Sequence, residues 1–295
     1  MQELEQGDYA ATGPRCARSV LMVEPADFSV SSQSALDNPY MNLVDTADAQ
    51  RALAQSRDLA RLISAQGIEV NRFPGRAQTP DDLFPNNVFA TTPGRFIIGH
   101  MLHPVRQKEA QRKDIRAFFQ SRTRETVDLS QQECIAELTG TLIVDSARHI
   151  GFCGLSGRVD PAGLEAMHRA FGLKMTLSFE MQPGEYHTNV IMMILASRTC
   201  VLYPGAFLDP AVPETIARAY PDQCLFLNEQ EKNAFAANCI ALTDTDLFMS
   251  KTGLDALRPS SREYLEDRGF VIHSTELDEI EKAGGSLRCM IAECF

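Results

Sequence analysis

Short apolar runs alternate with longer amphipathic segments along most of this 295-residue chain. Runs of about four to six residues, rich in Ile, Val, Leu and Phe, are typical of buried strands. The first run, at 19–23, precedes an amphipathic segment at 45–66 and a second run at 68–73. We therefore expect a strand, a helix and a strand, with Asp45 as the helix N-cap and Gly67 at its end.

The later part of the chain repeats this order with an additional strand in front. Paired strands are predicted at 88–91 and 96–99, 141–144 and 149–152, 190–195 and 200–203, and 239–242 and 246–249. Helices are predicted near 106–120, 161–171, 210–219 and 259–268, with single strands at 175–179 and 270–273. A repeat of roughly 50 residues favours a closed ring of similar α/β units.

The alternative to a ring is one doubly wound parallel sheet. Short polar turns at 146–148 and 197–199 argue against that sheet, because they indicate hairpins between antiparallel strands. Residues 1–17 lack periodicity, so we expect a loose leader followed by one domain at 18–295. Neither of the common glycine-rich nucleotide-binding motifs is present in the sequence, so no nucleotide is implied.

Composition narrows the classes of function. The 28 Lys and Arg residues against 39 Asp and Glu give a net charge of −11, which argues against a nucleic-acid partner. No apolar stretch reaches the roughly 18 residues of a membrane helix, and the acidic N-terminus is unlike a secretory signal. None of the eight cysteines forms a C-x-x-C pair, so we expect reduced thiols and a cytoplasmic location.

Four polar elements lie at the edges of predicted strands. Their key residues are Asn87, Glu137, His187 and Cys289, which are separated by 50, 50 and 102 residues. In a ring of similar units, this spacing places all four at one end, around a central cavity. Each also has a structural explanation: a turn asparagine, a surface carboxylate, a core histidine and a core thiol.

Cys289 differs from Cys294 because a Gly-Gly turn precedes it, which brings backbone N–H groups close to the sulfur. A cysteine with a histidine suggests a thiolate nucleophile and its base. A carboxylate and an asparagine beside them suit a planar substrate with many N–H donors, such as a guanidine. The set therefore fits attack on a guanidine or ureido carbon better than peptide hydrolysis.

Together these motifs resemble the pentein superfamily of guanidine-modifying enzymes, over about residues 19–295. The resemblance is greatest to the arginine dihydrolase, succinylarginine dihydrolase and amidinotransferase-like branch, and it implies a five-bladed pseudo-symmetric α/β propeller with a central site. The motifs that carry it are Asn38-Pro39-Tyr40-Met41, Phe84-Pro85-Asn86-Asn87-Val88, His187-Thr188-Asn189 and Gly284-Gly285-Ser286-x-x-Cys289.

The resemblance also implies roles for single residues. Cys289 matches the nucleophile, His187 the general acid and base, and Glu137 the carboxylate that clamps the guanidine. The substrate-binding residues that it implies are Asn87, Asn38, Asn189, Arg158 as the grip on the α-carboxylate, and Arg106 as a second candidate for that grip. The sequence departs from some relatives in having Asn86-Asn87 in place of an acidic pair and His103-Pro104 in place of Arg-Pro.

No cofactor or metal is implied; the pair His100-x-x-His103 has no accompanying carboxylate. We expect a cysteine hydrolase of arginine or a close derivative, acting as an arginine dihydrolase that gives ornithine, CO2 and ammonia. The alternatives are an arginine deiminase, a citrulline hydrolase, a dimethylaminohydrolase, an amidinotransferase, and an inactive ligand-binding member of the fold. The expected partner is a small guanidine or ureido molecule, with no nucleic acid or membrane; a homo-oligomer is compatible with the sequence.

Overall fold

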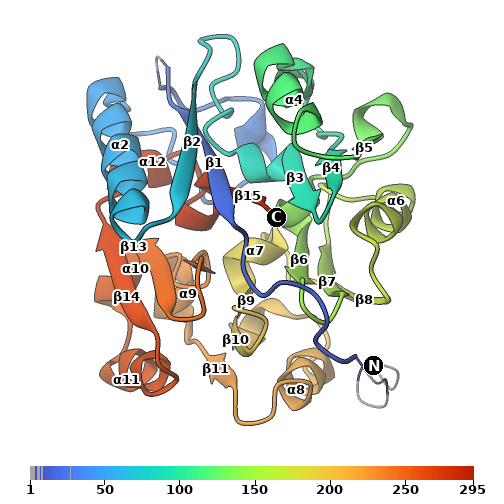
Figure 1. Cartoon of the computed structure of the whole chain (residues 1–295). Helices are drawn as coiled ribbons and strands as arrows, with labels where there is room; N and C mark the ends of the chain where they lie inside the picture. Colours follow the sequence, from blue (N-terminus) through green and yellow to red (C-terminus); the bar gives the residue numbers. More distant parts are fainter. Residues whose placement is uncertain (1–3, 5–6, 8, 27) are drawn as a thin grey trace.

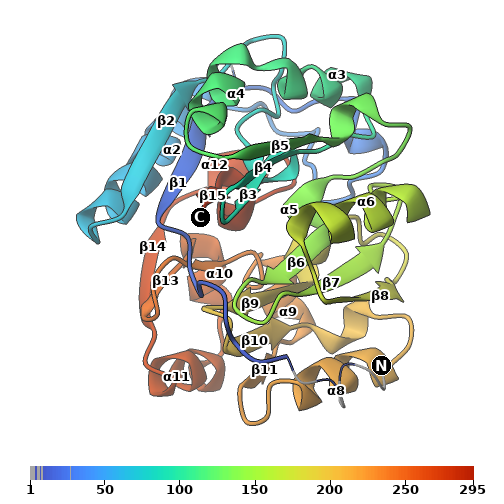
Figure 2. The same cartoon turned by 45° about the vertical axis from the view of Figure 1, so that its right-hand side comes forward.

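The computed structural model describes Leu4, Gly7, residues 9–26 and residues 28–295. Its strands form five three-stranded sheets arranged around a centre (Figures 1 and 2). In each sheet the middle strand pairs antiparallel with the inner strand and parallel with the outer one. Four of the sheets are thus a hairpin followed by a helical crossover, and in the first sheet the last strand of the chain takes the place of the inner hairpin strand. This arrangement confirms the predicted ring of α/β units, a five-bladed propeller, and excludes a single open sheet.

From the inner strand outward, the five sheets are β15 (Ala292–Cys294), β1 (Ser19–Glu24) and β2 (Glu69–Pro74); β3 (Phe89–Thr92), β4 (Arg95–Ile98) and β5 (Glu125–Asp128); β6 (Leu142–Asp145), β7 (Ile150–Leu155) and β8 (Met175–Glu180); β9 (Met192–Leu195), β10 (Thr199–Leu202) and β11 (Cys224–Phe226); and β12 (Ile240–Ala241), β13 (Asp246–Ser250) and β14 (Val271–Thr275).

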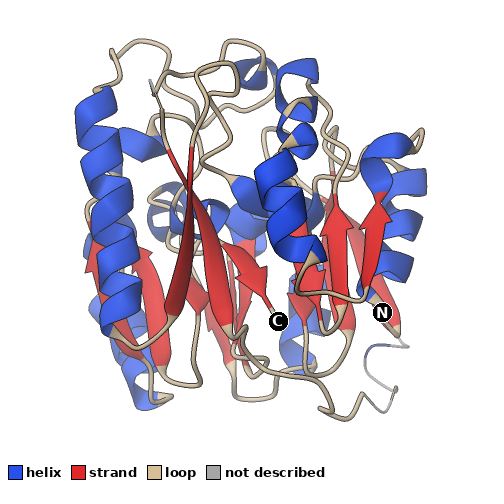
Figure 3. Ribbon diagram, turned by 45° about the horizontal axis from the view of Figure 1, so that its top comes forward, coloured by secondary structure: helices blue, strands red, loops and turns tan. Residues whose placement is uncertain are grey.

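One longer helix per sheet lies at the periphery of the ring (Figure 1). Figure 3 shows the strands toward the inside of the molecule and helices on its outside. The outer helices are α2 (Ala49–Ala65), α4 (Lys113–Gln120), α6 (Pro161–Phe171), α8 (Ala211–Arg218) and α11 (Pro259–Asp267). The shorter helices are α3 (Pro104–Gln107), α5 (Leu138–Thr141), α7 (Thr188–Ile191), α9 (Glu229–Asn233), α10 (Lys251–Ala256) and α12 (Asp278–Glu281). The 3-10 helices are η1 (Ser34–Leu36), η2 (Pro85–Asn87), η3 (Glu109–Gln111), η4 (Leu129–Gln131), η5 (Pro204–Ala206) and η6 (Leu287–Met290). No helix in the described part of the chain has the length and apolar character needed to cross a membrane.

Some predicted boundaries were wrong for local reasons. Helix α2 is capped by Asp48, whose side chain accepts from two backbone N–H groups, whereas Asp45 lies before the helix and accepts from Asn42. The predicted helix at 106–120 is three pieces, because the extended backbone of Arg112 interrupts it. The predicted strand at 190–195 starts as α7 and becomes β9 only at Met192. The strands β5, β11 and β15 were not predicted.

The last strand of the chain completes the first sheet. Strand β15 pairs antiparallel with β1, with Leu21 opposite Ala292, so that the two ends of the domain are hydrogen-bonded to one another. Apolar side chains fill the space between each sheet and its outer helix; the stacked rings of Phe96 and Phe119, 4.5 Å apart, are one example. Each such buried side chain contributes about 1.5–3 kcal/mol to folding.

The expected leader has no regular secondary structure over residues 9–17. It nevertheless contacts the domain, because the backbone N–H groups of Thr12 and Gly13 donate to the carbonyl of Ala147 in the β6–β7 turn. Tyr9 and Cys16 also pack against the core. The division into a leader and one domain at 18–295 stays a prediction.

Candidate active site

A short turn precedes the inner strand of four of the sheets, and each turn carries one of the predicted residues. Asn87 ends η2, Glu137 and His187 are the N-cap residues of α5 and α7, and Cys289 lies within η6. All four are at most 3% exposed. They meet at the end of the ring where these strands begin, as the spacing predicted.

A small cavity lies at this end. Its volume is about 20 Å³, which suits about one water molecule. It is lined by Ser34, Asn38, Asp81, Phe84, Asn87, Arg106, Arg158, Tyr186, His187, Ala283, Gly285 and Cys289. Residues 31–46, which we call the covering segment, contribute Ser34 and Asn38 to this wall.

Glu137 is bound on both carboxylate oxygens by groups of the protein. Its Oε2 lies 2.8 Å from Nε2 of His187 and 3.1 Å from Nη1 of Arg158, and its Oε1 accepts from the backbone N–H of Leu102. Burial alone would raise the pKa of Glu137, but the charge of Arg158 and the hydrogen bond of His187 outweigh it and hold the pKa well below its usual range. The side chain is therefore an ionised carboxylate that orients His187.

His187 turns its other ring nitrogen away from Glu137. Because an ionised carboxylate only accepts, Nε2 carries the hydrogen and Nδ1 is the free acceptor of the neutral ring. Burial lowers the pKa of His187, and the hydrogen bond with Glu137 only partly opposes this, so the ring is neutral at pH 7. Nδ1 is buried and has no hydrogen-bond partner among the described residues.

Gly140 has no side chain, which allows Asn87 and His187 to pack directly against its backbone. A Cβ atom at residue 140 would lie 2.9 Å from Nδ1 of His187 and 2.5 Å from Oδ1 of Asn87. Oδ1 of Asn87 is also buried and lacks a partner within the described part of the chain. Two unsatisfied acceptors therefore border the same small space, which is arranged to receive N–H or O–H donors.

Two asparagine amides contact the sulfur of Cys289. Nδ2 of Asn238 lies 3.3 Å from Sγ and Nδ2 of Asn189 lies 3.5 Å from it, while Oδ1 of Asn189 lies 3.7 Å away. Burial raises the pKa of the Cys289 thiol, against the hydrogen bonds from Asn238 and from the Ser286 backbone. The sulfur is thus surrounded by donors yet is a neutral thiol in this closed form.

The Gly-Gly turn before Cys289 leaves no space for a side chain at residue 284. Gly284 has φ of +75°, and a Cβ atom there would overlap the amide of Asn38. The carbonyl of Gly284 accepts from Nδ2 of Asn38 at 3.4 Å and from the hydroxyl of Tyr186 at 2.5 Å. The turn therefore fixes the covering segment as well as the cysteine.

The structure distinguishes the two arginines expected to bind substrate. Every guanidinium nitrogen of Arg158 donates within the protein, to Asp37, Glu137 and the carbonyl of Ser34. Arg106 donates to both oxygens of Glu109 through Nε and Nη2. Its Nη1 makes no hydrogen bond with the described residues, and Arg106 lines the cavity, so Arg106 has the freer donor.

Sequence reasoning missed several polar residues of the site, among them Ser34, Tyr186, Asp81 and Asn238. Asp81 lines the cavity as a buried carboxylate, with Oδ2 accepting from Ser34 Oγ at 2.5 Å, and no pattern in the sequence distinguished it from its neighbours. Asn238 could have been found, because it lies halfway along the 102 residues between His187 and Cys289. The roles of all the predicted site residues stay predictions.

No set of three or more His, Cys, Asp or Glu side chains in the described residues is arranged to hold a metal ion. His100 and His103 have separate partners, since Nδ1 of His100 lies 2.9 Å from the Gln132 carbonyl and Nε2 of His103 lies 2.8 Å from Asp37.

Comparison with known families agrees with this geometry. A family model described as N,N dimethylarginine dimethylhydrolase, eukaryotic, matches residues 24–295. The chain belongs to this family. It is thereby a member of the pentein superfamily and of its hydrolases that act on C–N bonds other than peptide bonds.

Individual relatives are distant but extend over most of the chain. An uncharacterized protein of Caenorhabditis elegans is 23% identical over 99% of both chains. The N(G),N(G)-dimethylarginine dimethylaminohydrolase of Mycobacterium tuberculosis is 23% identical, covering 97% of this chain and 89% of its own. The bifunctional arginine dihydrolase/ornithine cyclodeaminase AgrE of Nostoc is 22% identical over 86% of this chain and 35% of its own length.

Solved structures with the same fold include two enzymes of this superfamily. The N-terminal domain of ArgZ, a cyanobacterial arginine dihydrolase, superposes with a TM-score of 0.81 at 21% identity, covering 93% of this chain and 97% of that domain. A dimethylarginine dimethylaminohydrolase superposes with a TM-score of 0.72 at 18% identity, covering 94% and 99%. The propeller architecture is therefore shared with both.

Proposed function

We propose that this protein is a cysteine hydrolase that cleaves guanidine C–N bonds of arginine or a close derivative. The observation that carries the proposal is the grouping of Cys289, His187 and Asn87 around one closed space, with acceptors on His187 and Asn87 left unsatisfied. A buried unsatisfied polar group costs about 1–3 kcal/mol. Such a cost is recovered when a substrate rich in N–H donors binds there.

In the proposed reaction, Sγ of Cys289 attacks the guanidine carbon and a C–S bond forms. Nδ1 of His187 accepts the thiol proton and delivers it to the departing nitrogen, so that ammonia leaves as the C–N bond breaks. The same nitrogen then takes a proton from water, whose oxygen attacks the carbon and breaks the C–S bond. Glu137 keeps the imidazole in the tautomer that these transfers need.

The closed form holds a neutral thiol and a neutral imidazole, and a substrate cation changes this balance. A guanidinium beside Cys289 favours the thiolate, because an opposite charge within about 4–6 Å stabilises the charged form of an acid. A cationic guanidinium therefore helps to activate its own nucleophile, whereas attack on the neutral ureido intermediate relies on His187 alone to take the thiol proton. This preference agrees with arginine-like substrates.

The other end of an amino-acid substrate also has partners. Asp81 offers a buried carboxylate to an ammonium group, and the free Nη1 of Arg106 offers a donor to a carboxylate. Arg158 then serves to join Asp37 of the covering segment to Glu137. Because the present cavity has only about 20 Å³, substrate entry requires the covering segment to move outward.

Asn87 favours two hydrolytic cycles over one. Its oxygen accepts from a guanidinium N–H, and after rotation its NH2 group donates to the oxygen of a ureido group. An aspartate in its place would only accept and would repel that oxygen. The ureido intermediate is thereby retained for a second attack, and arginine with two molecules of water gives ornithine, CO2 and two molecules of ammonia.

A second candidate is hydrolysis of dimethylarginine to citrulline and dimethylamine, which the match of the family model favours. Because either reaction needs a free thiol at Cys289, we place the protein in a reducing compartment such as the cytosol.

The deciding experiment is incubation of the purified protein with arginine, citrulline, succinylarginine or dimethylarginine, followed by mass spectrometry of the products and an ammonia assay. Ornithine with two molecules of ammonia from each arginine is the expected result, and Cys289→Ser is the inactive control. Citrulline alone at long times would reduce the reaction to a deimination. Dimethylamine from dimethylarginine, with no turnover of arginine, would select the second candidate.

A further inference from the structure

Asn238 is a fully buried asparagine that contacts the sulfur of Cys289, and neither the motifs nor the proposed mechanism uses it. It lies in the turn before β12, where its backbone N–H donates to the carbonyl of Phe235. One hydrogen of its amide is directed at Sγ of Cys289 at 3.3 Å and the other at the carbonyl of Asn189 at 3.0 Å. Both donors are therefore used at the site.

The orientation of this amide is fixed. Oδ1 of Asn238 accepts from the backbone N–H of Arg288 at 3.1 Å, the residue just before the cysteine. If the amide were rotated by 180°, its NH2 group would face the Arg288 N–H and its oxygen would face the sulfur. The three side-chain hydrogen bonds of Asn238 would then be lost. Asn238 is thus a permanent donor toward Cys289.

Asn189 behaves differently at the same sulfur. It presents its NH2 group at 3.5 Å and its oxygen at 3.7 Å, so that it can accept from the thiol or donate to the thiolate. Of the two asparagines, only Asn238 acts in one direction, because a fixed donor stabilises the thiolate and gains little from the thiol.

The repeat of the ring gives Asn238 a defined place. The five positions that face the centre are Asn87, Glu137, His187, Asn238 and Cys289, with spacings of 50, 50, 51 and 51 residues. Each blade therefore supplies one polar residue to the centre from the turn before its inner strand. The blade of β12, β13 and β14 contributes Asn238.

We propose that Asn238 is the fifth residue of the reaction centre, a fixed hydrogen-bond donor that holds the Cys289 sulfur in place and stabilises its thiolate. The inference rests on the proposed role of Cys289 as the nucleophile. The other charged or titratable groups around the sulfur are Arg288 from its own turn and Tyr186 and His187 from the segment before α7. Asp81, Arg106 and Arg158 line the same cavity as the sulfur.

The test is the variant Asn238→Asp, which keeps an oxygen for the Arg288 N–H but removes both amide hydrogens. The rate at which iodoacetamide alkylates Cys289 is measured from about pH 6 to about pH 10, across the range in which a thiol ionises. We expect the alkylation profile to move to higher pH by about one to two pH units, and kcat/KM to fall about 10- to 100-fold, as for a lost hydrogen bond to a charged group.

Alkylation is read by mass spectrometry in a Cys294→Ser background, because Cys289 and Cys294 share the tryptic peptide 289–295. The matched control is Asn71→Asp, which removes the hydrogen bond from the Asn71 amide to the carbonyl of Val20, between β2 and β1 and outside the cavity. We expect the control to leave the alkylation profile in place. If Asn238→Asp is unfolded at the assay temperature, Asn238→Ser, which is neutral and too short to reach the sulfur, replaces it.

A folded Asn238 variant whose alkylation profile and activity match the parent protein would overturn the proposal, and so would an equal displacement in the Asn71 control. Alkylation needs no substrate. An absence of turnover on every guanidine therefore refutes the proposed function while the role of Asn238 is still measured.

Discussion

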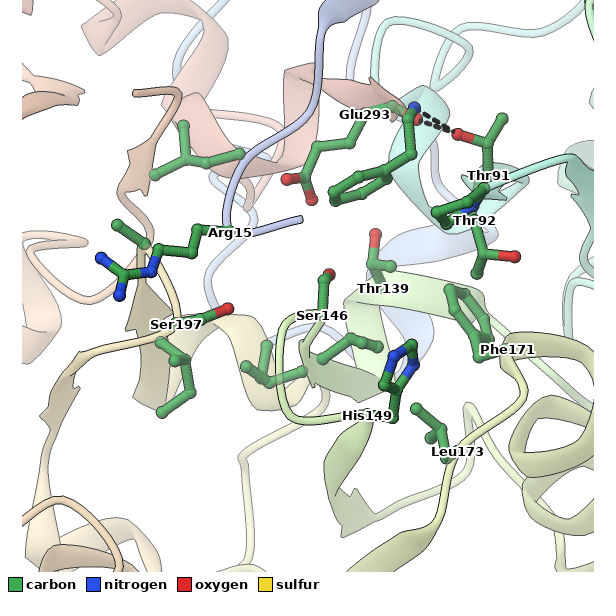
Figure 4. A pocket seen from close by; sticks show the side chains of 18 of the residues that line it. Arg15, Thr91, Thr92, Thr139, Ser146, His149, Phe171, Leu173, Ser197 and Glu293 are labelled. Atoms are coloured by element: carbon green, nitrogen blue, oxygen red, sulfur yellow. Dashed lines mark hydrogen bonds between the residues drawn. The ribbon is translucent and has the colours of Figure 1, made fainter. Parts of the chain in front are cut away.

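Two cavities at opposite ends of the inner strands differ in size and in chemistry. The candidate active site occupies about 20 Å³ among buried charged and amide groups. A cavity of about 250 Å³ lies at the other end, between the inner strands, and Figure 4 shows Thr91, Ser146, His149 and Phe171 on its walls. Thr139 lines the larger cavity, and its hydroxyl donates to the carbonyl of Asn86, the residue before Asn87 of the smaller one.

Cavity size alone would select the end away from the candidate active site. In the larger cavity the hydroxyl of Thr91 is satisfied by the backbone of Glu293 and Phe295 (Figure 4). At the smaller end, the side chains of Asn86, Asn87 and His187 provide four of the seven buried polar atoms without partners in the described part of the protein. Protein interiors rarely tolerate such atoms, so they mark the place where a polar ligand is expected.

The largest expected effect separates the nucleophile at the smaller end from an ordinary thiol. Cys289→Ser should lower kcat by at least about a thousandfold, because a serine hydroxyl is a much weaker nucleophile than a cysteine thiolate. Cys294→Ser should retain most of the activity, since Cys294 lies in β15 outside the cavity. Steady-state assays of both variants decide this, and equal activities would show that Cys289 is not the nucleophile.

The second-largest effect is expected at Gly140, whose backbone lies directly against Asn87 and His187. Gly140→Ala introduces a methyl group that overlaps Asn87 and His187, so kcat/KM should fall about 10- to 100-fold and Tm should decrease. Gly157→Ala is the control, because a methyl group there meets only ordinary contacts, at 3.8 Å or more. Unchanged kinetics in Gly140→Ala would show that this space is not used by the substrate.

A change of product, more than of rate, is expected at Asn87. Asn87→Asp should shift the output from ornithine toward citrulline about tenfold or more, because the carboxylate leaves the ureido oxygen unpaired. Time courses of both products from arginine give the ratio. An unaltered ratio would mean that another group retains the ureido intermediate.

A moderate effect concerns pH. His187 must be neutral to accept a proton at Nδ1, and burial holds its pKa below the ordinary value of 6.5. Activity should therefore be constant as pH falls to 6.5 and decline only below it. In Glu137→Gln the group that raises this pKa is lost, so the decline should move to still lower pH while the rate at pH 7 falls; a decline above pH 6.5 in the parent protein would contradict this assignment.

The smallest effect is expected in the larger cavity. Thr92→Val removes a hydroxyl from its wall but keeps a β-branched side chain at the end of β3. We expect kcat/KM to change by less than about twofold, as for surface substitutions without structural partners. A loss as large as that of Gly140→Ala would show that the two ends act together.

Much of this organisation was predicted from the sequence. The 50-residue repeat, the hairpins at 146–148 and 197–199, and helix α6 at Pro161–Phe171 follow from local periodicity and turn residues. The meeting of Asn87, Glu137, His187 and Cys289 follows from equal spacing in a closed ring. These features can be predicted from the sequence because each depends on residues that are close in the chain or on the length of the repeat.

Other features were decided by the tertiary structure. Strand β15 is too short to predict and forms because β1 presents a free edge to it. Arg158 is directed at Asp37 and Glu137, residues 121 and 21 positions away, and no sequence pattern specifies which carboxylate a buried guanidinium meets. Asn238 looks like a turn residue until folding places its amide beside Cys289. Hydrogen-bond partners of buried polar groups are chosen by distance in space, and that distance is set only when the five blades close into a ring.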